Sequence, residues 1–312
     1  MQTIVVVGAD TVVGANLAAV LSDSFHVFAI GSTANVDIAG CESAAGPLDD
    51  DRSARRWMAS VRPSHVVVCG AGAQSTWQQD ETAVPTRDDI NIGRTWARVA
   101  AEFDSHLTMI SSDAVFTGPW MFHREDSDGI CPSTPAGILR QIEQDTWQLC
   151  PDALIVRTHA IGWMPDSLGP GWIEQTLNQL NAGTAGPFDY LRHSTPILAT
   201  ELAGILVKAW EAGLEGEYHI AGSERINPGR FVERLAEQFQ LSAPIQPEDC
   251  AGKLPTGFGV GESSLHTAKI REALGISMPT ISDAFTELRE QCVNGFCDRL
   301  SAPAVTERQK VA

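Results

Sequence analysis

Short apolar runs alternate with helical stretches through the first two thirds of this 312-residue chain. The runs are rich in β-branched residues and have the length of strands that are buried on both faces. They are Thr3–Val7, His26–Ile30, His65–Cys69, Leu107–Ile110 and Ala153–Arg157. Alternation of this kind predicts parallel strands joined by crossover helices. The expected fold class is therefore α/β, a Rossmann-type doubly wound parallel sheet with a smaller C-terminal lobe.

Helical periodicity fills the segments between and after these runs. Four helices are predicted in the first half, at Asn16–Leu21, Arg52–Val61, Asp88–Phe103 and Ile138–Leu149. After about residue 160, Gly, Pro and Trp become frequent. Later helices are predicted at Thr200–Ala212, Pro228–Phe239, Lys269–Leu274 and Thr280–Gln291, with a strand at Glu217–Ala221.

Composition excludes several classes of partner. The net charge of -17 argues against a nucleic acid or an anionic membrane as the main partner. No apolar run reaches the roughly 18 residues of a membrane helix, and the N-terminus opens directly into a strand without a signal peptide. The seven cysteines are scattered without a Cys-x-x-Cys pair, which favours reduced thiols and a cytoplasmic location, although Cys292 and Cys297 could pair. The eight histidines are dispersed, so no metal is expected.

A glycine loop follows the first strand, reading Gly8-Ala-Asp-Thr-Val-Val-Gly14. A tight turn between a strand and a helix places backbone N–H groups and the helix dipole at a phosphate. We therefore predict a dinucleotide site at Gly8, Thr11, Val12 and Gly14. The alternative is that the two glycines only permit close packing of helix and strand.

The choice between NAD and NADP stays open. The second strand ends at Ser32, where an NAD site usually has Asp or Glu and an NADP site usually has Arg. Asp49 lies where such folds often contact adenine, but Asp49 to Asp51 are also good caps for the following helix. Gly70, Ala71 and Gly72 follow the third predicted strand and are further candidate cofactor contacts.

Five segments together resemble the dTDP-4-dehydrorhamnose reductase-like branch of the extended short-chain dehydrogenases. They are the glycine loop, Ile90-Asn91, the run Ser111 to Gly118, the run Val156 to Trp163, and the run Ser263 to Ile270. The resemblance implies a nucleotide-activated sugar as substrate, with NAD or NADP as cofactor. It places Ser112 at the family's catalytic Ser/Thr, although Ser112 could instead bond the local turn. It implies substrate contacts at Asp113, Val115, Trp163 and Arg192.

The chain departs from this family at the catalytic Tyr-x-x-x-Lys pair. Residues 1–189 contain no tyrosine and residues 1–207 contain no lysine. Aligned without a gap from Pro132 and Pro135, Ala136 falls on the Tyr and Arg140 falls on the Lys. Arg140 could hold a ribose or phosphate, but its pKa is too high for a relay acid.

His159 is the candidate replacement for the missing acid, because it follows the fifth strand at the expected cleft. The alternative is that His159 only hydrogen-bonds in place of an Asn. The resemblance divides the chain into a dinucleotide-binding domain at 1–160, to which part of 190–225 returns, a substrate-binding lobe at 161–297, and a loose tail at 298–312.

Two functions remain open from the sequence. The first is an atypical enzyme that acts on a nucleotide-activated sugar, with Ser112, His159 and Arg140 as its catalytic residues. The second is a non-catalytic pseudoenzyme that serves as a nucleotide-binding or regulatory subunit. A homodimer or a regulatory partner protein would fit either hypothesis.

Overall fold

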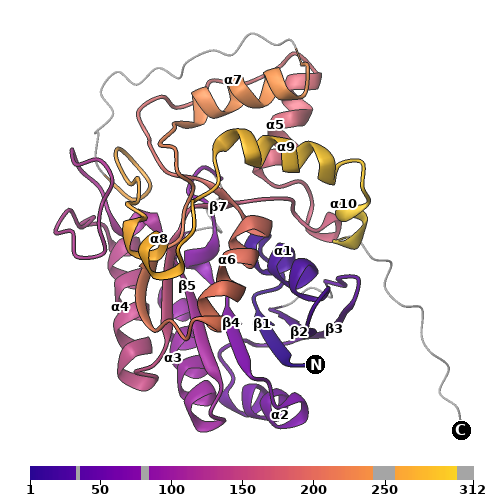
Figure 1. Ribbon diagram of the computed structural model, residues 1–312, viewed down its shortest axis with the longest axis vertical. Coiled ribbons are helices and arrows are strands. Elements are labelled where there is room, and N and C mark those ends of the chain that lie inside the picture. The colour runs from indigo at the N-terminus through magenta and orange to yellow at the C-terminus, as the bar shows by residue number, and fades with distance from the viewer. Residues whose placement is uncertain (33–35, 79–83, 242–256, 301–312) are drawn as a thin grey trace, which may run out of the picture.

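A seven-stranded parallel sheet forms the centre of the molecule (Figure 1). The computed structural model describes residues 1–32, 36–78, 84–241 and 257–300. In spatial order the strands are β3 (Cys41–Ala45), β2 (His26–Gly31), β1 (Thr3–Val7), β4 (His65–Val68), β5 (His106–Ser112), β6 (Leu154–Thr158) and β9 (Gly216–His219). The predicted Rossmann-type α/β fold is confirmed.

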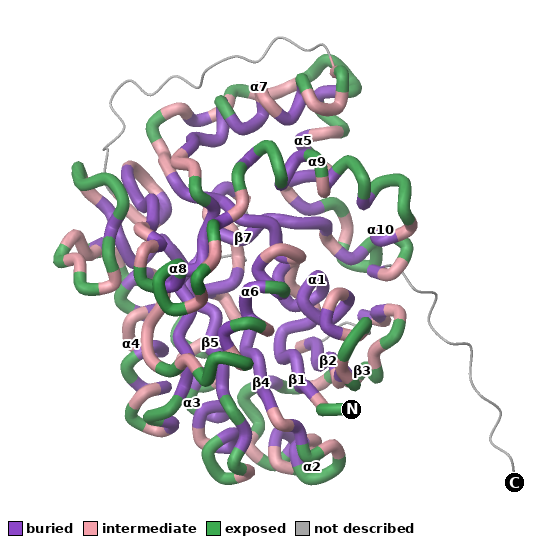
Figure 2. Tube along the Cα trace, in the orientation of Figure 1, coloured by how far each residue is buried: buried purple, intermediate pink, exposed green. Residues whose placement is uncertain are grey.

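Helices cover both faces of the sheet. On one face lie α1 (Val12–Leu21) and α6 (Ala199–Glu211), which pack against each other. On the other face lie α2 (Asp51–Val61), α3 (Arg87–Glu102) and α4 (Thr134–Leu149). Figure 2 shows the strands as the buried centre of the molecule, as expected for a parallel sheet that is covered on both sides.

A layer of helices from the second half of the chain gathers at one end of the molecule (Figure 1). They are α5 (Trp172–Asn181), α7 (Pro228–Gln238) and α9 (Ile281–Gln291). Phe231 joins them, because its ring packs against Trp172, Phe285 and Trp77 at centroid distances of 5.4, 4.8 and 5.4 Å. Two short strands, β7 (Ala160–Ile161) and β8 (Ile197–Leu198), pair beside this layer, and α8 (Ala268–Leu274) and α10 (Phe296–Arg299) follow later.

The sequence prediction missed the short strands β7 and β8, the strand β3, and the helices α5 and α10. β3 reads Cys-Glu-Ser-Ala-Ala and is half exposed, because it is an edge strand without the apolar pattern of its neighbours. α5 lies in the Gly- and Pro-rich stretch, and α10 has only four residues. Residues 301–312 of the predicted tail lie outside the described residues. Within the described part of the chain, no helix has the length and apolar character needed to span a bilayer.

Candidate functional site

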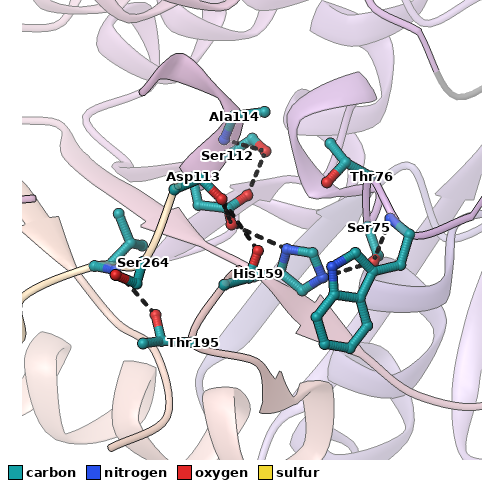
Figure 3. Close-up of polar contacts among 12 residues, drawn as sticks. Ser75, Thr76, Ser112, Asp113, Ala114, His159, Thr195 and Ser264 are labelled. Carbon is teal, nitrogen blue, oxygen red and sulfur yellow. Dashed lines mark hydrogen bonds and ion pairs between the residues drawn. The ribbon is translucent and has the colours of Figure 1, made fainter. Parts of the chain in front are cut away.

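Three polar side chains meet at the carboxyl ends of β4, β5 and β6, which are neighbours in the sheet. The Nδ1 atom of His159 lies 3.0 Å from Oδ2 of Asp113, and its Nε2 atom lies 2.8 Å from Oγ of Ser75. Figure 3 shows His159 between Asp113 and Ser75. Since the carboxylate of Asp113 accepts a hydrogen bond from Nδ1–H, Nε2 accepts a hydrogen bond from the Ser75 hydroxyl when the ring is neutral and donates one to it when the ring is protonated.

Asp113 is held from several sides. It is fully buried, and its Oδ2 atom also accepts a 2.7 Å hydrogen bond from Ser263. Burial alone would raise the pKa of Asp113, but the positive charge of His159 and the hydrogen bonds from His159, Ser194 and Ser263 hold it below its usual value. Asp113 is therefore a carboxylate that fixes the orientation of the His159 ring.

Ser112 points into the turn rather than toward a cavity. Its hydroxyl oxygen accepts a hydrogen bond from the N–H of Ala114 at 3.1 Å, which caps the short helix η3 (Asp113–Val115). The hydroxyl itself lies 3.3 Å from Oδ1 of Asp113. Ser112 thus occupies the local bonding position that the sequence offered as its alternative role, and it supports Asp113.

A cavity of about 310 Å³ lies beside this cluster, between the end layer of helices and the loop after β4. Its lining includes Trp77, Trp172, Asp189 and Arg192. The ring of Trp77 packs on His159 at a centroid distance of 4.7 Å, so one indole separates the cavity from the imidazole. The Nε1 atom of Trp77 is buried without a hydrogen-bond acceptor. Aromatic rings with an arginine and an unpaired donor suit a polar ligand that has a flat base or sugar ring.

Arg192 is the predicted substrate contact that lines this cavity. Its guanidinium donates to Asp189 at 2.8 Å and to the carbonyl of Thr76 at 3.2 Å. Val115 and Trp163 lie elsewhere. Val115 is buried in a cluster with Phe116 and Leu139, and Trp163 is buried with its Nε1 donating to Gln291.

The glycine loop keeps the geometry of a phosphate site. Gly8 has φ +79°, and a Cβ there would collide with the carbonyl of Cys69. A Cβ on Gly14 would collide with the carbonyl of Gly8. Thr11 caps α1, because its Oγ1 atom accepts from the N–H of Gly14 at 3.0 Å. The amides of Val12 and Val13 belong to the first turn of α1, where N–H groups have no acceptor within the helix.

Asp10 brings a carboxylate to the end of β2. Its Oδ2 atom accepts hydrogen bonds from the N–H and the hydroxyl of Ser32, at 2.8 and 2.5 Å. This is the position where an NAD site usually has its acidic residue, although here the acid comes from the loop after β1. A carboxylate at this strand end is the kind of group that accepts hydrogen bonds from a ribose diol.

Arg140 lies apart from the His159 cluster. It lines a separate hollow of about 410 Å³ with Glu125, Asp126 and Glu217. The neighbouring residue Leu139 points inward and packs against Val115. Arg140 points about 100° away from Leu139 around the helix, is only part-buried and faces this hollow. The structure thus does not bring Arg140 to His159.

The other predicted cofactor residues are spread along the sheet edge. Asp49 is exposed, and the cap of α2 is its neighbour Asp50. Gly70, Ala71 and Gly72 line a small hollow with Asp89 and Leu139, and a Cβ on Gly72 would crowd the backbone of Ile110. No group of three potential metal ligands occurs among the residues that the structure describes.

Sequence reasoning missed Ser75, Asp10 and Ser263 as site residues. Ser75 follows a glycine-rich stretch after β4, so its position at a strand end was the available signal. Asp10 lies inside the glycine loop itself. Ser263 opens the fifth segment of the family resemblance, but nothing in that segment shows that it reaches Asp113, which lies 150 positions earlier in the chain.

Comparison with known proteins agrees with this architecture. A model of the RmlD substrate binding domain matches residues 1–293. The chain belongs to this family. Family membership confirms the resemblance to dTDP-4-dehydrorhamnose reductases that the five sequence segments indicated.

Individual relatives are more distant. A probable low-salt glycan biosynthesis reductase of Haloferax volcanii is 27% identical over 185 residues, which are 57% of this chain and 61% of that protein. A hypothetical dTDP-4-dehydrorhamnose reductase of Sulfolobus tokodaii has a TM-score of 0.72 and 22% identity, with 91% and 99% of the two chains covered. The Bacillus anthracis reductase, solved with NADP, has a TM-score of 0.77 and 16% identity over 93% and 99% of the chains. The structural matches share the fold with this member of the RmlD substrate-binding family.

Proposed function

We propose that this protein is an NAD-linked oxidoreductase that acts on a nucleotide-activated sugar and uses His159 in place of the missing tyrosine. The observation that carries the proposal is the buried Asp113–His159 pair at the edge of the sheet, in a family of sugar-nucleotide reductases. A histidine that is oriented by a carboxylate can hold and release a proton near neutral pH. It can therefore take over the acid–base task without a tyrosine.

The cofactor would lie along the glycine loop. When it is bound, it supplies or accepts a hydride. Gly8 and Gly14 allow its pyrophosphate to approach the backbone, the first turn of α1 faces the phosphates, and Asp10 accepts the ribose hydroxyls. NADP in the Bacillus anthracis enzyme, and NAD with UDP in a Bordetella bronchiseptica enzyme of similar fold, support a dinucleotide and a nucleotide sugar as the two ligands.

The sugar nucleotide would occupy the cavity between Trp77 and Arg192. Trp77 and Trp172 offer rings for stacking, and Arg192 offers a cation to a phosphate. The Trp77 indole then covers His159 and keeps bulk water away from the proton-transfer group.

Calorimetric titration tests this function. The protein is titrated with NADH and with NADPH, each alone and then with a dTDP- or UDP-sugar present. We expect micromolar NADH binding that the sugar nucleotide strengthens. Loss of dihydronicotinamide absorbance with a dTDP-linked keto sugar then reports turnover. Absence of binding by either dinucleotide would contradict the proposal.

A non-catalytic binding subunit is the second candidate. Ala136 is buried at the start of α4, and the His159 side chain is fully covered. These two observations favour a protein that binds its ligands without turning them over. Tight binding of both ligands with no hydride transfer at any pH would support this candidate against the first.

A further inference from the structure

Ser75, His159 and Asp113 form one continuous chain of hydrogen bonds across three strand ends (Figure 3). The two ring nitrogens have different partners, with the carboxylate at Nδ1 and the hydroxyl at Nε2. This is the order of groups by which a histidine moves a proton to or from a serine hydroxyl in unrelated enzymes. Such an arrangement is recognised by its geometry and not by the positions of its residues in a sequence.

The exposure of the three residues shows which of them can reach a ligand. Asp113 and the His159 side chain are fully buried, and Trp77 packs against the ring. Ser75 is only half buried. His159 therefore cannot contact a substrate directly in this conformation. The Ser75 hydroxyl, in contrast, lies at the part-exposed end of the row of hydrogen bonds.

The segment that carries Ser75 also borders the cavity. Thr76 accepts a hydrogen bond from Arg192, and Trp77 lines the cavity wall. The N–H of Trp77 donates to the Ser75 oxygen at 3.2 Å, which fixes the hydroxyl relative to that wall. Ser75 itself does not line the cavity, but it is part-exposed and bonded to the residue that forms the cavity wall, so a ligand that extends past Trp77 would reach its hydroxyl.

We propose that Ser75 is a catalytic residue, whose hydroxyl passes a proton between the substrate oxygen and His159. This inference rests on the proposed function and adds the group that touches the substrate. In the reductive direction, a dihydronicotinamide is the hydride source. As the carbonyl carbon gains the hydride and its C–O π bond breaks, the Ser75 proton moves to the carbonyl oxygen. The Nε2 proton of His159 moves to the Ser75 oxygen, and the ring becomes neutral. The oxidative direction reverses each transfer.

Asp113 is a positioning residue in this scheme. It holds Nδ1 of the ring and keeps Nε2 aimed at Ser75. We therefore expect Asp113→Asn to lower kcat while KM changes little, because an amide holds the ring less firmly than a carboxylate does.

Matched variants test the role of Ser75 with two readouts. Ser75→Ala should lower kcat by about 10²- to 10⁴-fold, the usual contribution of a positioned acid or base, with NADH affinity unchanged. Ser75→Thr keeps the hydroxyl and should retain turnover within about tenfold of the wild type. Ser60→Ala, an exposed serine on α2, is the control. Wild-type turnover in Ser75→Ala would overturn the inference.

Labelling with a fluorophosphonate, followed by mass spectrometry, is the readout that does not need turnover. A hydroxyl paired with a histidine base should be labelled, and Ser75 labelling should disappear in His159→Gln. If the protein neither binds a dinucleotide nor reduces a sugar, the proposed function fails, but His159-dependent labelling would still support the Ser75–His159 pair. Two results would overturn the role of Ser75. One is that the wild type is not labelled and Ser75→Ala has wild-type turnover. The other is that the wild type is not labelled and shows no turnover at all.

Discussion

Single side chains in this protein fill positions that other residues usually occupy. Asp10 reaches the end of β2 from the glycine loop and binds Ser32 there, where the sequence has no acid on the strand itself. Similarly, the stretch of residues 1–189 that contains His159 has no tyrosine, and Ser75 is bonded to the His159 ring. In each case the chemical group is present, although the chain supplies it from a different position.

Asp10 predicts a preference for NADH over NADPH. Asp10→Asn removes a carboxylate that can accept both ribose hydroxyls, so NADH binding should weaken by about tenfold or more, the equivalent of one charged hydrogen bond. NADPH binding should weaken less or improve, because the repulsion of its extra phosphate is gone. Calorimetric titration measures both.

Glu42→Gln is the control for Asp10→Asn, since it removes the same charge from an exposed site on β3. Equal affinity of the wild type for NADH and NADPH would show that Asp10 does not select the cofactor.

Among the elements, α4 is fixed to the sheet by a buried ion-pair cluster. The Arg157 guanidinium on β6 donates to Glu143 on α4 at 2.9 and 2.7 Å and also pairs with Glu217 on β9. Ser111 on β5 donates to the same Glu143 carboxylate at 2.5 Å. Burial raises the pKa of Glu217 to about 7, although Arg157 opposes this shift. The cluster sets the rotation of α4, which turns Leu139 inward and Arg140 outward.

Arg157→Met should therefore destabilise the protein strongly. It leaves the buried Glu143 and Glu217 without their cation, and removal of one partner of a buried pair costs about 3–5 kcal/mol. Arg55→Met is the matched control, because Arg55 makes a comparable two-point ion pair with Glu102 at the surface. That exposed pair should contribute about 1 kcal/mol or less. Denaturant unfolding measures the free energy of unfolding of the two variants. Equal losses of this free energy would contradict a stabilising role for the buried ion-pair cluster.

For the whole molecule, buried histidines link stability to pH. Burial lowers the pKa of His65 to about 4, with a smaller contribution from His106. Burial and the nearby Arg157 charge lower the pKa of His219 to about 3, and neither of its ring nitrogens has a hydrogen-bond partner. Both values lie below that of an unfolded histidine, so the unfolded chain binds more protons below about pH 6.5. Stability should consequently fall as the pH drops from about 6.5 toward 4, and the lowered pKa of Asp113 adds to this loss at still lower pH.

His219→Phe should flatten this pH dependence. The variant removes one side chain that, between about pH 4 and 6, is neutral in the folded protein and charged in the unfolded chain. The slope of the unfolding free energy against pH should therefore decrease by up to about 1.4 kcal/mol per pH unit. Melting temperatures between pH 4 and 8 provide the measurement. His26→Asn, at a half-exposed histidine, is the control for the loss of an imidazole from the surface. An unaltered slope in His219→Phe would show that another group causes the acid sensitivity.

The sequence by itself determined the parallel sheet, most of its helices and the family. A strand such as Thr3–Val7 is formed by residues that are adjacent in the sequence, and the same is true of the turn that needs a glycine at Gly8. Such features can therefore be predicted from a short segment of sequence. Only the tertiary structure decided which polar groups meet. Ser75 and His159 are 84 positions apart, and His159 and Asp113 are 46 apart. Their contact depends on β4, β5 and β6 lying side by side, and the direction of Arg140 depends on how a buried ion-pair cluster rotates α4. Both are properties of packing between distant segments, which local periodicity does not record.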